Sequence, residues 1–191
     1  PLVNRTGSDS SSLDNMLEVL VAGGMDLHRA IRMPIPPAWQ NVEHLDPDLR
    51  AFYEFNSMHT EAWDGPAGLV LTDGRFAVCA LDRNGLRPSR WVLSRDDLLV
   101  VASEVGVCAL DPGEVAAKGR LGPGQLLSVD TATGTLRHTA EVDDELKRRH
   151  PYKQWLKDNT LRLEGTLGQD RATRELEGEP LCMAMKMYQV S

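Results

Sequence analysis

The chain has 191 residues and a formal net charge of -7 at pH 7, with 21 lysine and arginine residues against 28 aspartate and glutamate residues. This length allows a buried hydrophobic core, and we expect one domain plus an appendage. The acidic balance argues against nucleic acid as the main partner, and no apolar run approaches the length of a membrane span.

The first predicted element is an amphipathic helix. Ser11 and Asp14 have the spacing of a capping box, which places the start of the helix near Ser11. Gly23 and Gly24 are typical of a left-handed helix C-cap. The buried stripe is predicted from apolar residues at i, i+3 and i+4 spacing, namely Leu13, Met16, Leu17, Leu20 and Val21.

One carboxylate, Asp9, stands among small hydroxyl residues just before this helix. Asp9 and its neighbours can cap the helix, and the local pattern alone favours this interpretation. Alternatively, Asp9 lies just outside the cap, where the helix dipole stabilises its charge and it accepts an ammonium group through charge-assisted hydrogen bonds. Phosphate binding by the serines and the helix amides is a third interpretation, which repulsion from Asp9 disfavours.

Two further helices and an extended connector are predicted next. The first of these helices runs from Asp26 to about Met33. Three prolines among residues 34–41 exclude a helix there, so we expect an extended connector. The following helix has Asp46 as its predicted N-cap and Pro47 at its first position.

From residue 66 onward the pattern changes to short strands. The dipeptides Asp73-Gly74 and Asn84-Gly85 favour tight hairpin turns. These features predict an antiparallel meander packed against helices, which is an α+β fold. The predicted strands are residues 69–71, 76–81, 90–93, 98–102 and 125–129.

A charged helical region is predicted from Asp143 to about Leu163, with Pro151 starting its second half. Residues 164–180 are polar and contain glycine, as is typical of a linker. Residues 183–190 have the pattern of the start of another element. Because the chain begins at a proline without a methionine, we expect it to be a piece of a longer protein.

The cysteines and histidines indicate no metal site. Cys79 and Cys108 lie in apolar, strand-like runs, which predicts buried, reduced thiols and a cytoplasmic location. Neither the three cysteines nor the five histidines have metal-ligand spacing. The sequence also contains no nucleophile elbow and no P-loop.

The polar segment 82–90 contains arginines that could clamp a carboxylate. Its favoured interpretation is an Asn-Gly turn, with Asp82, Arg83 and Arg87 pairing to hold a hairpin. Glu61, Trp63 and Asp64 likewise indicate a corner between helix and strand, where small residues permit close backbone packing.

Several uncommon motifs occur together in a fixed order. They are Gly7-Ser8-Asp9-Ser10, Leu13-Asp14-Asn15, Pro37-Ala38-Trp39, Asp64-Gly65-Pro66-Ala67-Gly68, Asp82-Arg83-Asn84-Gly85-Leu86-Arg87-Pro88, Ala102-Ser103-Glu104-Val105-Gly106 and His150-Pro151-Tyr152-Lys153. In order and spacing, the chain from about Asn4 to Leu163 resembles the glutamine amidotransferase domain of glutamate synthase large subunits. That domain is a class II, N-terminal-nucleophile hydrolase.

The resemblance implies a domain organisation. Residues 1–163 would form the C-terminal portion of the amidotransferase domain, part of a four-layer αββα sandwich of antiparallel strands with flanking helices. Residues 164–180 would be a linker, and residues 181–191 the start of the central domain of the family.

The resemblance also implies a reaction. In this family the N-terminal cysteine attacks the side-chain amide of glutamine, its own α-amino group acts as the base, and a thioester is hydrolysed to glutamate. The ammonia reaches a distant FMN site, where 2-oxoglutarate is aminated reductively. FMN and an iron-sulfur cluster are expected elsewhere in the full-length protein, with an electron-donating small subunit or ferredoxin as partner.

Within this segment the resemblance assigns one substrate-binding residue. Asp9 matches the aspartate that binds the α-ammonium group of glutamine. No catalytic residue, metal ligand or cofactor ligand is expected in this segment. Pro1 stands where no cysteine can be the nucleophile, and in the family the carboxylate-binding arginine and the oxyanion Asn-Gly pair lie upstream. Asn84-Gly85 is therefore assigned to a hairpin, and the 191-residue chain alone is expected to be inactive.

Two alternatives stay open. One is another class II glutamine amidotransferase, of purine or amino-sugar metabolism. The segment from Trp63 to Ala67 and His150-Pro151-Tyr152 favour glutamate synthase over those enzymes. The other is a non-catalytic α+β binding module that retains the shell of the amidotransferase fold.

Overall fold

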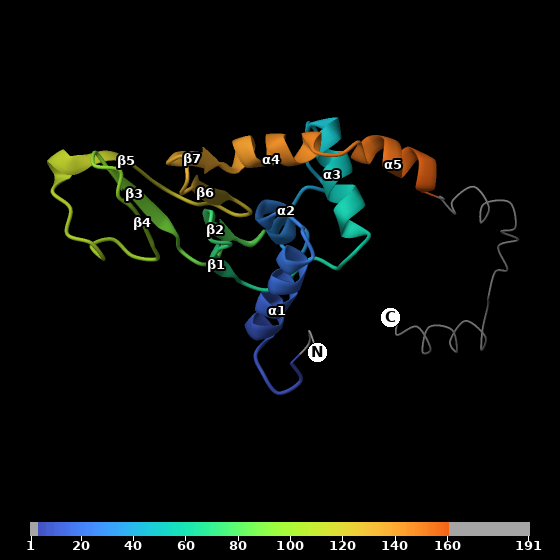
Figure 1. The fold of residues 1–191 in the computed structure, drawn as a ribbon, viewed down its shortest axis with the longest axis horizontal. Helices are drawn as coiled ribbons and strands as arrows, with labels where there is room; N and C mark the ends of the chain where they lie inside the picture. The colour runs from blue at the N-terminus through green and yellow to red at the C-terminus, as the bar shows by residue number, and fades with distance from the viewer. Residues whose placement is uncertain (1–3, 161–191) are drawn as a thin grey trace, which may run out of the picture. The chain divides into compact units, whose positions relative to one another are not determined.

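A computed structural model describes residues 4–160 of the chain (Figure 1). Residues 4–157 belong to one compact unit, and residues 158–160 belong to a second unit. The predicted linker, residues 164–180, and the predicted start of a further domain, residues 181–191, lie outside the described residues. The predicted domain boundaries therefore stay predictions.

Helix α1 covers Asp9–Ala22 and begins earlier than predicted. The side chain of Ser8 is the N-cap and accepts the amide of Ser11 at 3.2 Å. The predicted capping box of Ser11 and Asp14 is therefore wrong, because Ser11 already lies within the first helical turn. At the other end, Gly24 has a φ of +91°, the left-handed conformation predicted for the C-cap region.

The other helices follow the predicted order. Asp46 caps α3 as predicted, and Asp26, the first residue of the second predicted helix, is the N-cap of α2; both side chains accept helix amides. The predicted charged helical region begins earlier than expected, at Thr139 instead of Asp143, and its second half starts after Pro151 as predicted, as a separate helix. Their bounds are α2 Leu27–Arg32, α3 Pro47–Ser57, α4 Thr139–Arg148 and α5 Tyr152–Asn159.

The strands form two antiparallel sheets, which confirms the α+β prediction (Figure 1). A four-stranded sheet has the order β1-β2-β6-β7 and a three-stranded sheet has the order β4-β3-β5. The strands are β1 Gly68–Thr72, β2 Phe76–Leu81, β3 Arg90–Ser94, β4 Leu99–Ala102, β5 Val115–Arg120, β6 Leu126–Asp130 and β7 Thr135–His138.

The predicted single meander is wrong, because β2 pairs with β6 while β3, β4 and β5 form a separate sheet. Residues 82–89 connect the two sheets, so Asn84-Gly85 is a turn but not a hairpin. Strands β5 and β7 were absent from the prediction. β5 escapes it because its alanines and glycine have low strand propensity, and Gly119 is instead fixed by close approach to the indole ring of Trp91.

Each face of the four-stranded sheet carries its own core. Phe76, Val78 and Ala80 of β2 face the helices, in a cluster with residues of α2, α3, α4 and α5. Cys79 and Leu81 face the other way, toward Trp91 and strand β4 of the second sheet. This alternation along β2 is the period-two pattern of a strand covered on both faces.

A buried ion pair joins three helices beneath the sheet. Arg32, 1% exposed, donates from Nε to Asp143 at 2.9 Å and from Nη2 at 3.3 Å. Its Nη1 donates to the carbonyl oxygen of Gly124 at 2.8 Å, and the Tyr53 hydroxyl donates to Asp143 at 3.0 Å. The guanidinium thus links α2 to α4 and to the loop that precedes β6.

Replacing Arg32 by methionine should lower the free energy of unfolding by about 3–5 kcal/mol, because Asp143 would stay buried without its cation. The double variant Arg32→Met/Asp143→Leu removes both charges, and its free energy of unfolding should fall clearly less than that of the single variant. Urea unfolding of both variants measures this difference. Equal losses in the two variants would contradict the explanation, since packing alone would then account for the effect.

A second buried polar group, His28, packs against the sheet. His28 is only 3% exposed, and its Nε2 lies 2.7 Å from the Ser128 hydroxyl oxygen. Its ring packs edge-on against the ring of Phe76. Burial lowers the pKa of His28, although the negative charges of Asp26 and Glu145 act in the opposite direction. The folded state therefore holds this imidazole neutral.

This lowered pKa predicts that stability falls as the pH drops from 7 to 5. Below about pH 6.5 the unfolded chain protonates His28 while the folded chain resists it, so the free energy of unfolding decreases. Replacing His28 by glutamine should flatten this slope in urea unfolding between pH 5 and 7. Asp46 does not act in this window, because its hydrogen bond with Lys147 lowers its pKa to about 2. An unchanged slope in the variant would rule out His28 as the cause.

Candidate functional site

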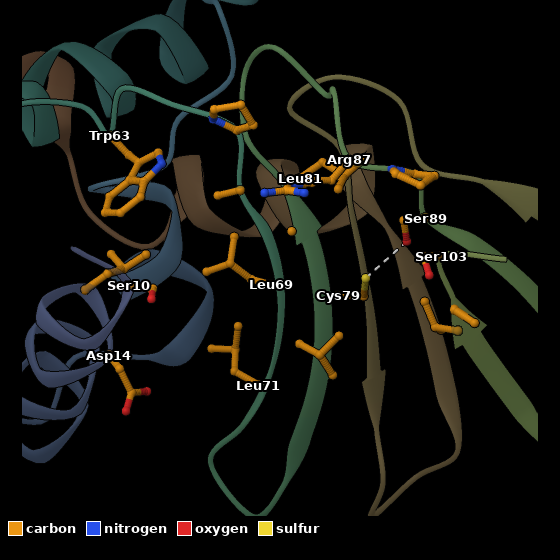
Figure 2. Close-up of a pocket in the computed structure, with 18 of the residues that line it drawn as sticks. Ser10, Asp14, Trp63, Leu69, Leu71, Cys79, Leu81, Arg87, Ser89 and Ser103 are labelled. Atoms are coloured by element: carbon orange, nitrogen blue, oxygen red, sulfur yellow. Dashed lines mark hydrogen bonds between the residues drawn. The ribbon is translucent and has the colours of Figure 1, made fainter. Parts of the chain in front are cut away.

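A cleft of about 870 Å³ lies beside the edge strand β1, between the first half of α1 and the end of β4. Figure 2 shows Ser10 and Asp14 of α1 on one side of it, and Arg87, Ser89 and Ser103 on the other. The side chains of β1 and β2 lie between these two groups. The cleft is therefore built from α1 and from residues 63–104, and both sheets border it.

Asp9 lines this cleft as the first residue of α1. The expectation that it lies just outside the cap is wrong, because Asp9 is already helical. The alternative, capping by Asp9 and its neighbours, is correct for the neighbour Ser8 and wrong for Asp9 itself. One carboxylate oxygen of Asp9 accepts the amide of Ser10 at 2.7 Å. Among residues 4–160 the other oxygen has no hydrogen-bond partner. An exposed carboxylate at the positive end of a helix, with a free oxygen beside a cleft, can receive a cationic group.

The motif segments that are far apart in the sequence converge on this cleft. Trp63 and residues 66–68 come from one motif region, Arg87 from the next, and Ser103 with Glu104 from a third. Local sequence patterns had indicated a corner at Trp63 and a hairpin at Arg87, and so missed both as cleft residues. The signal that could have found them is the ordered motifs, since Arg87 belongs to one and Trp63 immediately precedes another.

The cleft wall is held by a buried carboxylate, Asp82, which is 1% exposed. Its Oδ1 accepts the amide of Ala67 at 3.1 Å and its Oδ2 accepts the amide of Asn84 at 2.8 Å. Its backbone carbonyl oxygen accepts the amide of Gly124 at 2.8 Å. Asp82, predicted to pair with arginines in a hairpin, instead fixes three backbone segments. Arg83 pairs with Asp64 at 3.2 Å.

Neither described cysteine has the environment of a nucleophile. Cys79 borders the cleft but is 7% exposed, and its Sγ lies 3.3 Å from the Ser89 hydroxyl oxygen (Figure 2). Burial raises the pKa of the Cys79 thiol, which keeps it protonated. Cys108 is free and exposed in the loop after β4, so the prediction that it is buried in a strand is wrong. The prediction of a buried, reduced Cys79 is confirmed.

The described residues contain no group of three or more histidine, cysteine, aspartate or glutamate side chains arranged to hold a metal ion. No helix within residues 4–160 is long and apolar enough to cross a membrane.

Comparison with known proteins identifies the family. The family model described as glutamine amidotransferases class-II matches residues 1–155. The chain belongs to this family. The α+β arrangement of the described residues is therefore that of a class II amidotransferase, an N-terminal-nucleophile hydrolase.

Curated proteins similar to this chain include several glutamate synthases. The chain is 42% identical to the glutamate synthase [NADH] of Schizosaccharomyces pombe over 157 residues, which are 82% of this chain and 7% of that protein. It is 39% identical to the glutamate synthase [NADPH] large chain of Bacillus subtilis over 163 residues, 85% of this chain and 11% of that protein. It is 41% identical to the ferredoxin-dependent glutamate synthase of Pyropia yezoensis over 160 residues, which are 83% of this chain and 10% of that protein. The chain thus spans about a tenth of the length of these relatives.

The two described cysteines should differ sharply in reactivity. At pH 8 iodoacetamide should modify Cys108 readily and Cys79 only after urea unfolding, because the Cys79 thiol is buried and its pKa is raised. Mass spectrometry of peptides from the native chain measures both sites, and a Cys108→Ser variant provides the control. Rapid modification of Cys79 in the folded chain would contradict its assignment as a buried, unreactive thiol.

Proposed function

We propose that this chain forms part of the glutamine-hydrolysing domain of a glutamate synthase, which releases glutamate and ammonia from glutamine. The observation that carries the proposal is the position of Asp9 in a cleft on which the separate motif segments converge. Family membership and the names of the relatives support it.

Asp9 has the chemistry to hold the substrate by its α-ammonium group. Its carboxylate is exposed to the cleft and is already oriented by the hydrogen bond from the Ser10 amide. Charge-assisted hydrogen bonds from an ammonium group to such a carboxylate are short and directional. Trp63 and Leu69 offer apolar surface to the methylene groups of glutamine.

The attacking group is proposed to be an N-terminal cysteine outside the described residues. Its sulfur would displace ammonia from the side-chain amide, and water would then release glutamate from the thioester. Cys79 cannot replace it, because a buried protonated thiol is a poor nucleophile. The role of the described residues is to bind and orient glutamine, and we assign no bond-making step to them.

The later steps of glutamate synthesis are proposed for the longer protein. Ammonia would meet 2-oxoglutarate at an FMN site, with electrons arriving through an iron-sulfur cluster from a small subunit or ferredoxin. We place both cofactors in other parts of the longer protein, as the resemblance to glutamate synthases implies. The relatives carry NADH, NADPH and ferredoxin in their names, and the electron donor stays open. We also propose a cytoplasmic location, for which the free thiol of Cys79 is the support.

An amidotransferase of purine or amino-sugar metabolism is less well supported, since the relatives compared above are glutamate synthases. A non-catalytic binding module is the remaining candidate. Such a module would need no site for a substrate ammonium group. A substitution at Asp9 therefore distinguishes the binding module from a glutamine-hydrolysing domain.

In the complete glutamate synthase, replacing Asp9 by asparagine should raise the KM for glutamine and lower kcat/KM about 10- to 100-fold, the equivalent of one hydrogen bond to a charged group. Activity with ammonium chloride should stay nearly unchanged, because ammonia bypasses the amidotransferase cleft. Steady-state assays with each nitrogen donor measure both effects.

Glu18→Gln is the matched control. It removes the same charge from the exposed side of the same helix, outside the cleft, and should leave both activities unchanged. An unaltered KM for glutamine in the Asp9 variant would refute the proposed ammonium site, and an equal loss with ammonia would indicate damage to the fold instead.

A further inference from the structure

Four cations of the second sheet and its approach loop form a cluster that we call the arginine surface. They are Arg87, Arg90, Lys118 and Arg120. All four are exposed, and within residues 4–160 none of their side chains forms an ion pair or a hydrogen bond. Most other cations of the described chain do, including Arg32, Arg75, Arg137 and Arg149. In a chain with a net charge of -7, an unpaired group of cations needs its own explanation.

The sheet register places like charges side by side. Arg90 of β3 is the direct antiparallel partner of Arg120 of β5, and Lys118 pairs with Val92. Direct partners on adjacent strands point to the same face, as do residues two apart, so these three cations share one face. Trp91 and Gly119 occupy the opposite, inward face. Two like charges in direct register repel each other, which destabilises the sheet unless an anion is bound.

A shallow cleft of about 300 Å³ lies among these cations. Arg87, Arg90 and Arg120 line it together with Leu86, Leu121 and Pro123, and no acidic residue does. Leu86 is 71% exposed beside the arginines. The surface therefore combines guanidinium groups, which suit bidentate binding of carboxylates, with an exposed apolar side chain.

The floor of this cleft is rigid. Gly85 has a φ of +59°, and a Cβ atom there would lie 2.6 Å from the Cα atom of Pro123. The turn after β2 and the loop before β6 are thus locked against each other, and Asp82 joins the same two segments through the Gly124 amide. A backbone that is already fixed needs no ordering when a partner binds, which lowers the entropic cost of binding.

We propose that the arginine surface docks an acidic polypeptide segment with an apolar residue beside its carboxylates. A small anion alone would leave Leu86 and Lys118 without a role. Nucleic acid is disfavoured by the net negative charge of the chain. Protection of an edge strand is a further explanation for Lys118 and Arg120, because β5 lies at the edge of its sheet, but it does not account for Arg87 or for Arg90 on the central strand.

Docking at this surface would act beside the candidate active site. Arg87, Pro88 and Ser89 line both the shallow cleft and the larger cleft that contains Asp9. An acidic segment bound to Arg87 would thus lie against the shared wall of the two clefts. The docking surface does not rest on the proposed glutamine site, since it is argued from unpaired cations alone.

Titration calorimetry of the 191-residue chain with poly-L-glutamate tests the proposal. We expect saturable binding that weakens as salt is added. The double variant Arg90→Gln/Arg120→Gln should weaken it about tenfold or more, and Arg90→Lys/Arg120→Lys should lie between, because lysine keeps the charge but not the bidentate fork. The control Arg148→Gln/Lys153→Gln removes the same charge from exposed cations on α4 and α5 and should bind as the unaltered chain does.

Equal weakening in the control would overturn the proposal, because binding would then follow net charge alone. Binding of inorganic phosphate that blocks poly-L-glutamate completely would indicate a small-anion site instead. Equally tight binding of a single-stranded DNA oligonucleotide would indicate a nucleic-acid surface. If the arginine variants aggregate but bind poly-L-glutamate normally, the cations protect the sheet edge and do not dock a partner.

Discussion

The buried pair of Arg32 and Asp143 is the constraint on which the arrangement of this unit depends. A guanidinium that is 1% exposed must satisfy its donors inside the protein. It does so with two bonds to Asp143 of α4 and one to the carbonyl oxygen of Gly124. These bonds have directions that apolar packing lacks, so they set where α4 and the loop before β6 lie relative to α2. Burial also raises the pKa of Tyr53, which keeps its hydroxyl available as a donor to Asp143.

This constraint reaches the cleft through the backbone. The loop fixed by Arg32 at the Gly124 carbonyl donates its Gly124 amide to the carbonyl of Asp82, and Asp82 holds the amide of Ala67 in the cleft wall. A path of hydrogen bonds thus leads from the helix layer to the proposed substrate site. Arg32, Asp82 and Gly124 are buried and Ala67 is half-buried, and the groups in the path are paired, which restricts the position of the wall. We infer that the charged core serves to position this wall as well as to stabilise the fold.

The two clefts share a wall but differ in charge. Acidic side chains, Asp9, Asp14 and Glu104, line the larger cleft, whereas arginines line the smaller one. Arg87 belongs to both. This division matches the two ligands that we propose, an ammonium-bearing small molecule for the larger cleft and an acidic segment for the smaller one. Both clefts lie beside the rigid turn at residues 82–85.

The sequence by itself determined the local elements and the family. Periodicity and caps placed the helices, because helix ends need nearby side-chain partners at fixed spacing, and the ordered motifs placed Asp9 in a class II amidotransferase.

The sequence could not determine which strand pairs with β2. The Asn84-Gly85 dipeptide is compatible with a hairpin, and the tertiary structure instead pairs β2 with β6, which lies more than forty residues later. Cys108 and the strand β5 also escaped the prediction, since exposure and the contact of Gly119 with Trp91 depend on distant neighbours. Only the tertiary structure brings Trp63, Arg87 and Ser103 to the cleft of Asp9, because non-local packing and buried hydrogen bonds, absent from any short window of sequence, decide which segments meet.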